Sequence, residues 1–161
     1  MSIYIGGTGS ANEFTDYEEG TTTLSVHGTN GFSGESYGHR TLLYRKVGRL
    51  VYIQFRLDFN GGTANGNQLI MTGLPFIVAN SPSTISSANY IKMEGYCNTS
   101  NGNHSSISSG QWGFSISPLL FPNDSKIFFY KQLNDTVAYL SGSDAGNQFD
   151  WLGSCCYATN S

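Results

Sequence analysis

The chain has little charge, no long apolar run and no leader-like start, and each shortage excludes a class of protein. Charged residues make up only 12% of its 161 residues, and the formal net charge is −3 at pH 7. A nucleic-acid-binding protein normally carries excess positive charge, so we expect no nucleic-acid partner. No stretch approaches the roughly 18 apolar residues of a membrane-spanning helix, so we expect no membrane insertion. The N-terminus lacks a basic region followed by an apolar stretch, so we expect no signal peptide.

Cysteine and histidine are too sparse to build a disulfide framework or a zinc site. There are three cysteines, Cys97, Cys155 and Cys156, and two of them are adjacent. Neighbouring residues of a strand point to opposite faces, so we expect free, buried or half-buried thiols, as in a protein assembled in a reducing cytoplasm. The three histidines have no H-x-x-x-H or C-x-x-C partner. Gly7-Thr8-Gly9 lacks the third glycine of a dinucleotide loop. We therefore expect no metal and no cofactor.

The few charges that are present do not predict catalysis. Glu13, Asp16, Glu18 and Glu19 could bind Ca²⁺ through oxygen, but they lack the spacing of a calcium loop, so we interpret them as solvated acids. Other acids are scattered singly, whereas a glycosidase needs two carboxylates across a sugar ring. Five of the eight basic residues fall within residues 40–56. They are either solvated charges of a hairpin or a patch for an acidic glycan or a partner subunit.

Small polar and aromatic residues dominate the composition and predict many short strands. The chain has 21 serines, 20 glycines and 14 asparagines, and aromatic residues make up 14%. This balance favours strands joined by tight turns over helices, and so many aromatic residues are atypical of disorder. The length is sufficient for one domain with a core of its own.

Period-2 alternation locates the strands, most clearly in residues 50–59. There Val51, Ile53, Phe55, Leu57 and Phe59 share one face, while polar residues share the other. Gly48 is the expected turn before this strand, and Pro118 and Pro122 are expected to bracket a connection without a central strand. The pattern predicts an all-β protein, an antiparallel β-sandwich of jelly-roll type. The nine expected strands are residues 21–27, 40–47, 50–59, 68–72, 86–97, 111–117, 126–133, 136–140 and 148–157.

Aromatic residues and loop amides are the candidates for ligand contact. An exposed Trp112 or Trp151 ring could stack on a sugar, although we favour a core or interface position for each. Tyr96 has the same ambiguity. Asn65 and Asn101 lie in polar loops, where binding residues concentrate. The loops in question are residues 61–67, 98–110 and 144–148.

Four motifs, in order, resemble the distal β domain of bacteriophage tail-fibre proteins, particularly those of cyanobacterial and other environmental phages. They are a Gly-Gly-Thr-Gly and Ala-Asn stretch, an Asp-Tyr-Glu-Glu-Gly-Thr segment, a Tyr-x-Lys-(Ile/Val)-Gly-x-x-Val-Tyr pattern and a Gly-Leu-Pro-Phe. They stand at residues 6–12, 16–21, 44–52 and 73–76. The family usually continues Gly-Thr with Trp-Thr-Pro, whereas this chain has Thr22-Thr23-Leu24, so we expect its first strand to pack differently.

The resemblance implies a non-enzymatic protein of the virion surface, made in the bacterial cytoplasm and released by lysis. It implies a homotrimer that contacts other virion proteins and binds host surface polysaccharide or lipopolysaccharide. We expect residues 1–20 to form an N-terminal attachment segment and residues 21–161 a single sandwich domain.

Tail fibres of this family carry an adaptor and a shaft before this domain, whereas Met1 lies only a few residues upstream. We therefore expect the segment, including Ile5, Tyr17, Glu18 and Glu19, to dock directly on other virion proteins. The alternative is a capsid decoration protein, of the cement or head-fibre kind, that docks on the shell through residues 1–20. A polysaccharide hydrolase is the third hypothesis.

Overall fold

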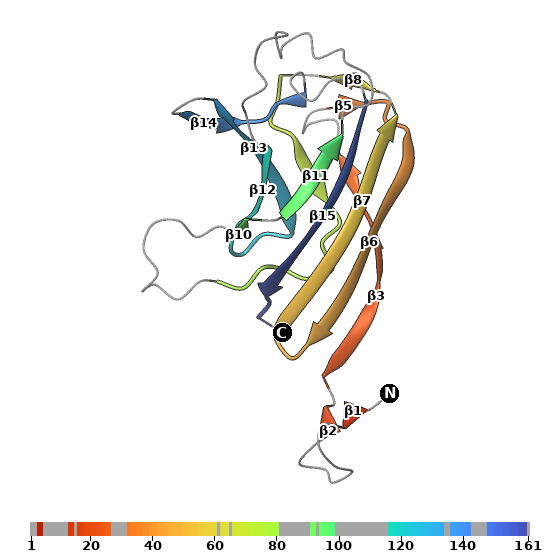
Figure 1. The fold of residues 1–161 in the computed structure, drawn as a ribbon, viewed down its shortest axis with the longest axis vertical. Helices are drawn as coiled ribbons and strands as arrows, with labels where there is room; N and C mark the ends of the chain where they lie inside the picture. The colour runs from red at the N-terminus through yellow and green to blue at the C-terminus, as the bar shows by residue number, and fades with distance from the viewer. Residues whose placement is uncertain are drawn as a thin grey trace.

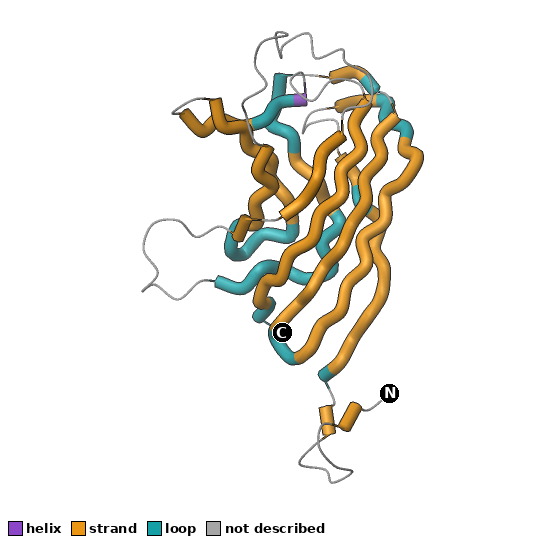
Figure 2. Tube along the Cα trace, viewed as in Figure 1, coloured by secondary structure: helices purple, strands orange, loops and turns teal. Residues whose placement is uncertain are grey.

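The fold consists almost entirely of β-strands. The computed structural model describes residues 3–4, 13–14, 16–26, 32–60, 62–64, 66–80, 91–92, 94–98, 116–133, 136–142 and 148–160. Strands form most of this part of the chain, and its helix is confined to Gly142 (Figures 1 and 2). All the strand pairs described are antiparallel. The expectation of an all-β protein built from antiparallel sheets is confirmed.

Most of the strands belong to two main sheets. The first has five strands in the order β11-β15-β7-β6-β3. They are β11 (Glu94–Asn98), β15 (Gln148–Ala158), β7 (Leu50–Asn60), β6 (Tyr37–Val47) and β3 (Tyr17–Thr23). The second has six strands, in the order β10-β12-β13-β9-β4 with β14 also beside β13. They are β10 (Ile91–Lys92), β12 (Ile116–Leu120), β13 (Lys126–Leu133), β9 (Ile70–Thr72), β4 (Ser25–Val26) and β14 (Thr136–Tyr139).

Two short strand pairs lie outside the main sheets. β1 (Ile3–Tyr4) pairs with β2 (Glu13–Phe14), and β5 (Phe32–Ser33) pairs with β8 (Thr63–Ala64). In Figure 1 the β1–β2 pair lies at the lower end of the molecule, beyond the start of β3. The N-terminal residues therefore contribute a separate small hairpin before the chain enters the five-stranded sheet.

The two sheets pack face to face around one apolar core, and β7 provides its centre. Val51, Ile53, Leu57 and Phe59 are fully buried, as the alternating pattern predicted. Each such side chain stabilises the fold by about 1.5–3 kcal/mol relative to an exposed position. The six-stranded sheet contributes buried residues from the opposite side, Met71, Ile127 and Phe129 among them. The ring centroids of Phe129 and Trp151 lie 3.7 Å apart and join the two sheets.

One strand of the first sheet continues directly into the second. β3 and β4 are separated only by Leu24, which is fully buried and whose backbone N–H donates to the carbonyl oxygen of Arg40 at 2.9 Å. A Cβ atom at Gly73 would lie 2.5 Å from the carbonyl oxygen of Thr23 at this crossing. At the other edge, β10 and β11 follow one another in the same way. The chain therefore closes both edges of the sandwich by switching sheets.

The β6–β7 hairpin follows the prediction closely. Gly48 turns the chain with a φ of 57°, a left-handed conformation that glycine adopts without steric cost. The register then runs from Val47↔Leu50 along the two strands, with one irregularity between Tyr37 and His39. This hairpin forms the middle of the five-stranded sheet.

Several predictions about strand boundaries were wrong, and two of them concern where a strand begins or continues. Residues 17–20 were expected to precede the sandwich, but Tyr17 to Gly20 are the first half of β3 and pair with β6 in register. The second concerns Pro118, which lies inside β12. β12 pairs with β13 along five residues, whereas its described pairing with β10 covers only Leu119 and Leu120. Proline has no backbone N–H to donate. A strand tolerates this loss where one of its two sides is not hydrogen-bonded to a neighbouring strand along its whole length.

Candidate functional site

The outer face of the five-stranded sheet is open to solvent and mixed in character. Alternation along each strand places every second side chain on this face. It carries polar residues together with several exposed apolar ones, which are Leu43, Val47, Leu50 and Leu152. Leu43 and Leu50 are more than half exposed, at 52% and 56%. A face of this kind is available for a ligand that offers both apolar and hydrogen-bonding surface.

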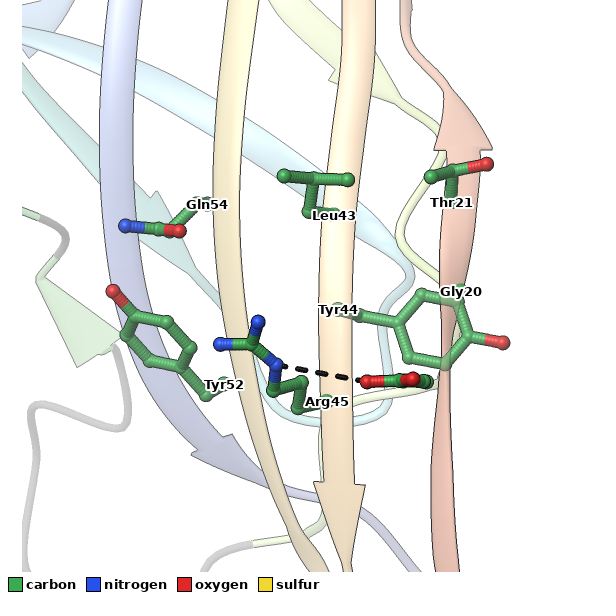
Figure 3. Close-up of a pocket in the computed structure, with 8 residues that line it drawn as sticks. Gly20, Thr21, Leu43, Tyr44, Arg45, Tyr52 and Gln54 are labelled. Atoms are coloured by element: carbon green, nitrogen blue, oxygen red, sulfur yellow. Dashed lines mark ion pairs between the residues drawn. The ribbon is translucent and has the colours of Figure 1, made fainter.

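A groove of about 380 Å³ runs across β3, β6 and β7 on this face. The strand register sets its side chains in two adjacent rows. The first row is Glu19, Arg45 and Tyr52, and the second is Thr21, Leu43 and Gln54. Since neighbouring strands lie about 4.8 Å apart, each row brings three different side chains within reach of one small ligand. Figure 3 labels Arg45 and Tyr52 of the first row and Thr21, Leu43 and Gln54 of the second.

Gly20 and Tyr44 form the floor between the two rows. They face one another in the register, and the Tyr44 ring packs at right angles to Phe76 on the core side of the sheet, with centroids 5.5 Å apart. A Cβ atom on residue 20 would lie 2.8 Å from the Tyr44 hydroxyl oxygen. The hydroxyl donates to Oε1 of Glu18 at 2.9 Å, and this bond raises the pKa of Tyr44. Glycine at position 20 therefore makes room for a ring that holds the floor in place.

The charged end of the groove is a loose ion pair. Nε of Arg45 lies 3.8 Å from Oε2 of Glu19, and both side chains are exposed. The Tyr17 hydroxyl donates to the same carboxylate oxygen at 2.6 Å, which raises the pKa of Tyr17. A distance of 3.8 Å is longer than a charge-assisted hydrogen bond of about 2.7–2.9 Å. A ligand hydroxyl can therefore approach both groups.

Several polar groups of the groove make no bond to the protein. Within the described part of the chain, the hydroxyls of Thr21 and Tyr52 and the amide of Gln54 have no hydrogen-bond partner. Figure 3 shows the Tyr52 ring beside the Arg45 guanidinium, with the Gln54 amide next to it. These groups offer one aromatic face, one amide and two hydroxyls to a ligand.

The basic residues of the hairpin contact different partners. Lys46 is buried on the core side, with Nζ 2.7 Å from Oδ1 of Asp16. Arg56 binds Asp150, Arg49 donates to the carbonyl oxygen of Thr159, and Arg40 lies over the Tyr37 ring. Three of the five basic residues of the hairpin, Arg45, Lys46 and Arg56, are therefore paired with carboxylates, which weakens the hypothesis of a cationic patch for an acidic glycan. The alternating faces of β6 and β7 separate charges that are close in the sequence.

The structure describes only some of the predicted contact residues. Trp151 is 3% exposed and packs on Phe129, so the favoured core position is confirmed and its ring has no face free for a sugar. Tyr96 lies in β11 opposite Leu152, but its side chain is outside the described residues. Trp112, Asn65, Asn101 and Ile5 also lie outside them.

Of the predicted attachment residues that the structure describes, Tyr17, Glu18 and Glu19, only Glu19 lines the groove. Tyr17 supports it through a hydrogen bond, and Glu18 holds Tyr44. All three belong to β3 and are therefore part of the sheet. The sequence reasoning placed ligand contacts on loops and missed Tyr52 and Gln54. Their signal was present, since both are polar positions of the clearest alternating strand.

The two motifs at residues 16–21 and 44–52 come together in this groove. The first forms most of β3, and the second forms the end of β6, the turn and the start of β7. Together they supply six of the eight lining residues, namely Glu19, Gly20, Thr21, Tyr44, Arg45 and Tyr52. Two of the four sequence motifs therefore also build the candidate site.

The described residues offer no arrangement for metal binding. Asp16, Glu18 and Glu19 are each engaged by a different partner, Lys46, Tyr44 and Tyr17, respectively. No group of three His, Cys, Asp or Glu side chains suited to a metal occurs in the part of the chain that the structure describes. In that same part, no helix has the length and apolar character needed to cross a membrane.

Comparison with known proteins finds no family model, no curated protein and no solved structure that matches this chain. The site is therefore argued from its own geometry, with the groove across β3, β6 and β7 as its centre.

Proposed function

We propose that the chain is a receptor-binding module of a bacteriophage virion surface, similar to the tip of a tail fibre and without enzymatic activity. In this proposal it is a jelly-roll-type sandwich that assembles as a homotrimer and contacts other virion proteins. Its ligand is a glycan of the host surface, either a polysaccharide or the sugar part of a lipopolysaccharide. The observation that carries the proposal is the groove of two three-residue rows on an open sheet face.

The composition of the groove supports a saccharide ligand. A sugar ring combines an apolar face with a rim of hydroxyl groups that both donate and accept hydrogen bonds. The groove offers Tyr52 and Leu43 for the first surface and Arg45, Glu19 and Gln54 for the second. Aromatic side chains with a polar tip suit interfaces that are apolar on one side and wet on the other.

The number of carboxylates in the groove supports binding over hydrolysis. Glycosidases hold the scissile bond between two carboxyl groups, about 5–10 Å apart according to mechanism. Glu19 is the only acidic residue among the eight that line the groove. A single carboxylate can accept a hydrogen bond from a sugar hydroxyl, but it leaves the second catalytic role unfilled.

Trimer formation would strengthen a site of this size. A shallow groove that contacts one or two sugar units binds weakly alone, and three copies on a repetitive polysaccharide gain affinity through effective concentration. Gel filtration with light scattering is expected to give three times the 17.5 kDa mass of one chain. A monomer at micromolar concentration would contradict this part of the proposal.

A second proposal is docking on the capsid shell through the N-terminus. The observation that favours it is the β1–β2 pair, which joins neither main sheet. Because Tyr17–Gly20 belong to β3, the docking segment would be shorter than residues 1–20. Removal of residues 1–15 is expected to abolish incorporation into virions without unfolding the sandwich, and full occupancy of the truncated protein would exclude this role.

Retention of bacterial surface polysaccharide tests the glycan-binding function. The protein is immobilised at high density, so that the result does not depend on its oligomeric state, and is expected to retain purified polysaccharide or whole cells of the host. Tyr52→Ala is expected to lose retention. Tyr139→Ala removes an exposed tyrosine from the other sheet and serves as the matched control. Absence of retention by the unmodified protein would exclude the proposal.

A further inference from the structure

Each of the two cations around the groove is compensated by carboxylates, which limits the saccharides that the groove can take. Glu19 faces Arg45 within the groove. Farther along the same face, Nε and Nη2 of Arg56 lie 3.2 and 2.9 Å from the two carboxylate oxygens of Asp150, and Asp58 lies 4.0 Å from Nη2. These described side chains comprise two cations and three carboxylates. A sugar carrying a carboxylate, sulfate or phosphate would find no uncompensated cation among them.

An anionic sugar would also be repelled at the place where it could best bind. The guanidinium of Arg45 is the only cation among the groove-lining residues, and the carboxylate of Glu19 lies beside it. A second carboxylate drawn to Arg45 would come close to Glu19, and two like charges at such a distance repel. The Tyr17 hydroxyl donates to Oε2 of Glu19 at 2.6 Å and so holds this carboxylate in place beside Arg45.

The same pair suits two neighbouring hydroxyls of a neutral ring. One hydroxyl can accept a hydrogen bond from Arg45 and the next can donate one to Glu19, since the 3.8 Å between Nε and Oε2 leaves both groups accessible. Tyr52 is opposite Arg45 in the register, so its ring lies on the other side of the guanidinium from Glu19. Figure 3 shows Tyr52 beside Arg45, and the dashed line from Arg45 marks its ion pair with Glu19.

We infer that the groove binds one neutral pyranose, which bridges Glu19 and Arg45 through two adjacent hydroxyls and packs its apolar face on Tyr52. The Gln54 amide and the Thr21 hydroxyl, in the second row, receive the remaining hydroxyls of the ring. This inference rests on the proposed glycan-binding function and adds the ligand class and its orientation. It moves the contact site from the loops to the open sheet face.

Binding of small glycosides tests the inference directly. Methyl glucoside, galactoside and mannoside are compared with the corresponding methyl hexuronides, by saturation-transfer NMR and calorimetry at 0.15 M salt, where distant charges are largely screened. At least one neutral glycoside is expected to bind about tenfold more tightly than its uronide, a difference that one charge-assisted hydrogen bond supplies. Tyr52→Ala is expected to abolish binding, whereas Tyr139→Ala, the matched control on β14, leaves it unchanged.

A variant that removes the charge of Glu19 distinguishes most clearly between neutral and anionic sugars. Glu19→Gln keeps the shape of the side chain but leaves Arg45 uncompensated, so the neutral glycoside is expected to weaken about tenfold while the uronide gains affinity. A wild-type preference for uronides would overturn the neutral class but leave the glycan-binding function intact. If no glycoside binds, or if Tyr52→Ala binds glycosides as the unmodified protein does, the groove is not the binding site. Retention of whole polysaccharide in that case would show that the function stands and resides elsewhere.

Discussion

Nζ of Lys46 lies 2.7 Å from Oδ1 of Asp16, and this contact fastens the beginning of β3 to β6. The lysine side chain is only 7% exposed, whereas the aspartate is 57% exposed. The carbonyl oxygen of Asp16 also accepts a hydrogen bond from the N–H of Gly48 at 2.9 Å. Residue 16 therefore holds both the buried ammonium and the β6–β7 turn, directly beside the groove strands.

Removal of the carboxylate is expected to destabilise the protein through the lysine. Asp16→Ala leaves a buried ammonium without its acceptor, which costs about 1–3 kcal/mol of unfolding free energy. Urea unfolding at pH 7 measures this cost. In a Lys46→Met background the same substitution is expected to cost much less, because no buried charge remains to be compensated. Glu19→Ala is the exposed-pair control and is expected to cost under about 1 kcal/mol. Equal losses for the two alanine variants would contradict this explanation.

Alanine at Gly73 is expected to be far more harmful than alanine at Gly48. Both glycines have positive φ, 118° and 57°, but no atom lies within 4 Å of a Cβ built on Gly48. A Cβ at residue 73 would meet the carbonyl oxygen of Thr23 at 2.5 Å, at the point where the chain switches sheets. We expect Gly48→Ala to cost about 1 kcal/mol, and Gly73→Ala at least about 3 kcal/mol because overpacking adds to the backbone strain.

Thermal or urea unfolding of the two glycine variants provides the comparison. If they lose the same stability, the crossing at Leu24 can shift to admit a methyl group, and the close approach is not essential. A failure of Gly73→Ala to fold, with Gly48→Ala folded, agrees with the prediction. The two substitutions are chemically identical, so the difference reports only their surroundings.

The protein is expected to lose stability in alkaline solution through Cys155. Burial, with a smaller contribution from Cys156, raises the pKa of the Cys155 thiol from 9.0 to about 12. The folded state then holds this proton more tightly than the unfolded chain does. The resulting stability is complete below pH 9 and is lost as the pH rises from 9 toward 12. By pH 10 we expect a loss of about 1.4 kcal/mol. Burial raises the pKa of Tyr157 as well, which acts in the same direction.

Urea midpoints at pH 7 and pH 10, under reducing conditions, test this dependence. Cys155→Ala is expected to show a smaller alkaline loss than the unmodified protein, whereas Cys156→Ala, which removes an exposed thiol, retains the full loss. At pH 8 iodoacetamide is expected to label Cys156 in the folded protein and to leave Cys155 unmodified. An alkaline loss that is unchanged in Cys155→Ala would assign it to other groups.

The groove shows why a candidate site was harder to predict than a strand. Tyr52 and Gln54 were recognisable as solvent-facing positions, and Glu19 was recognisable as an exposed acid. Nothing local to either segment indicated that Glu19 lies in the same row as Tyr52, with Arg45 between them. That relation is set by the pairing register of β3 with β6, which depends on contacts distant in the sequence.

The sequence by itself determined the fold class, the β6–β7 hairpin and the buried face of β7, because alternation and turn chemistry act over a few neighbouring residues. It also correctly favoured a core position for Trp151. Only the tertiary structure decided that β3 begins at Tyr17, that β12 passes through Pro118 and that the basic residues of the hairpin contact different partners. Each of these depends on which strands become neighbours and on which partner lies across the sheet, and pairwise contacts between distant segments leave no periodic trace in the chain.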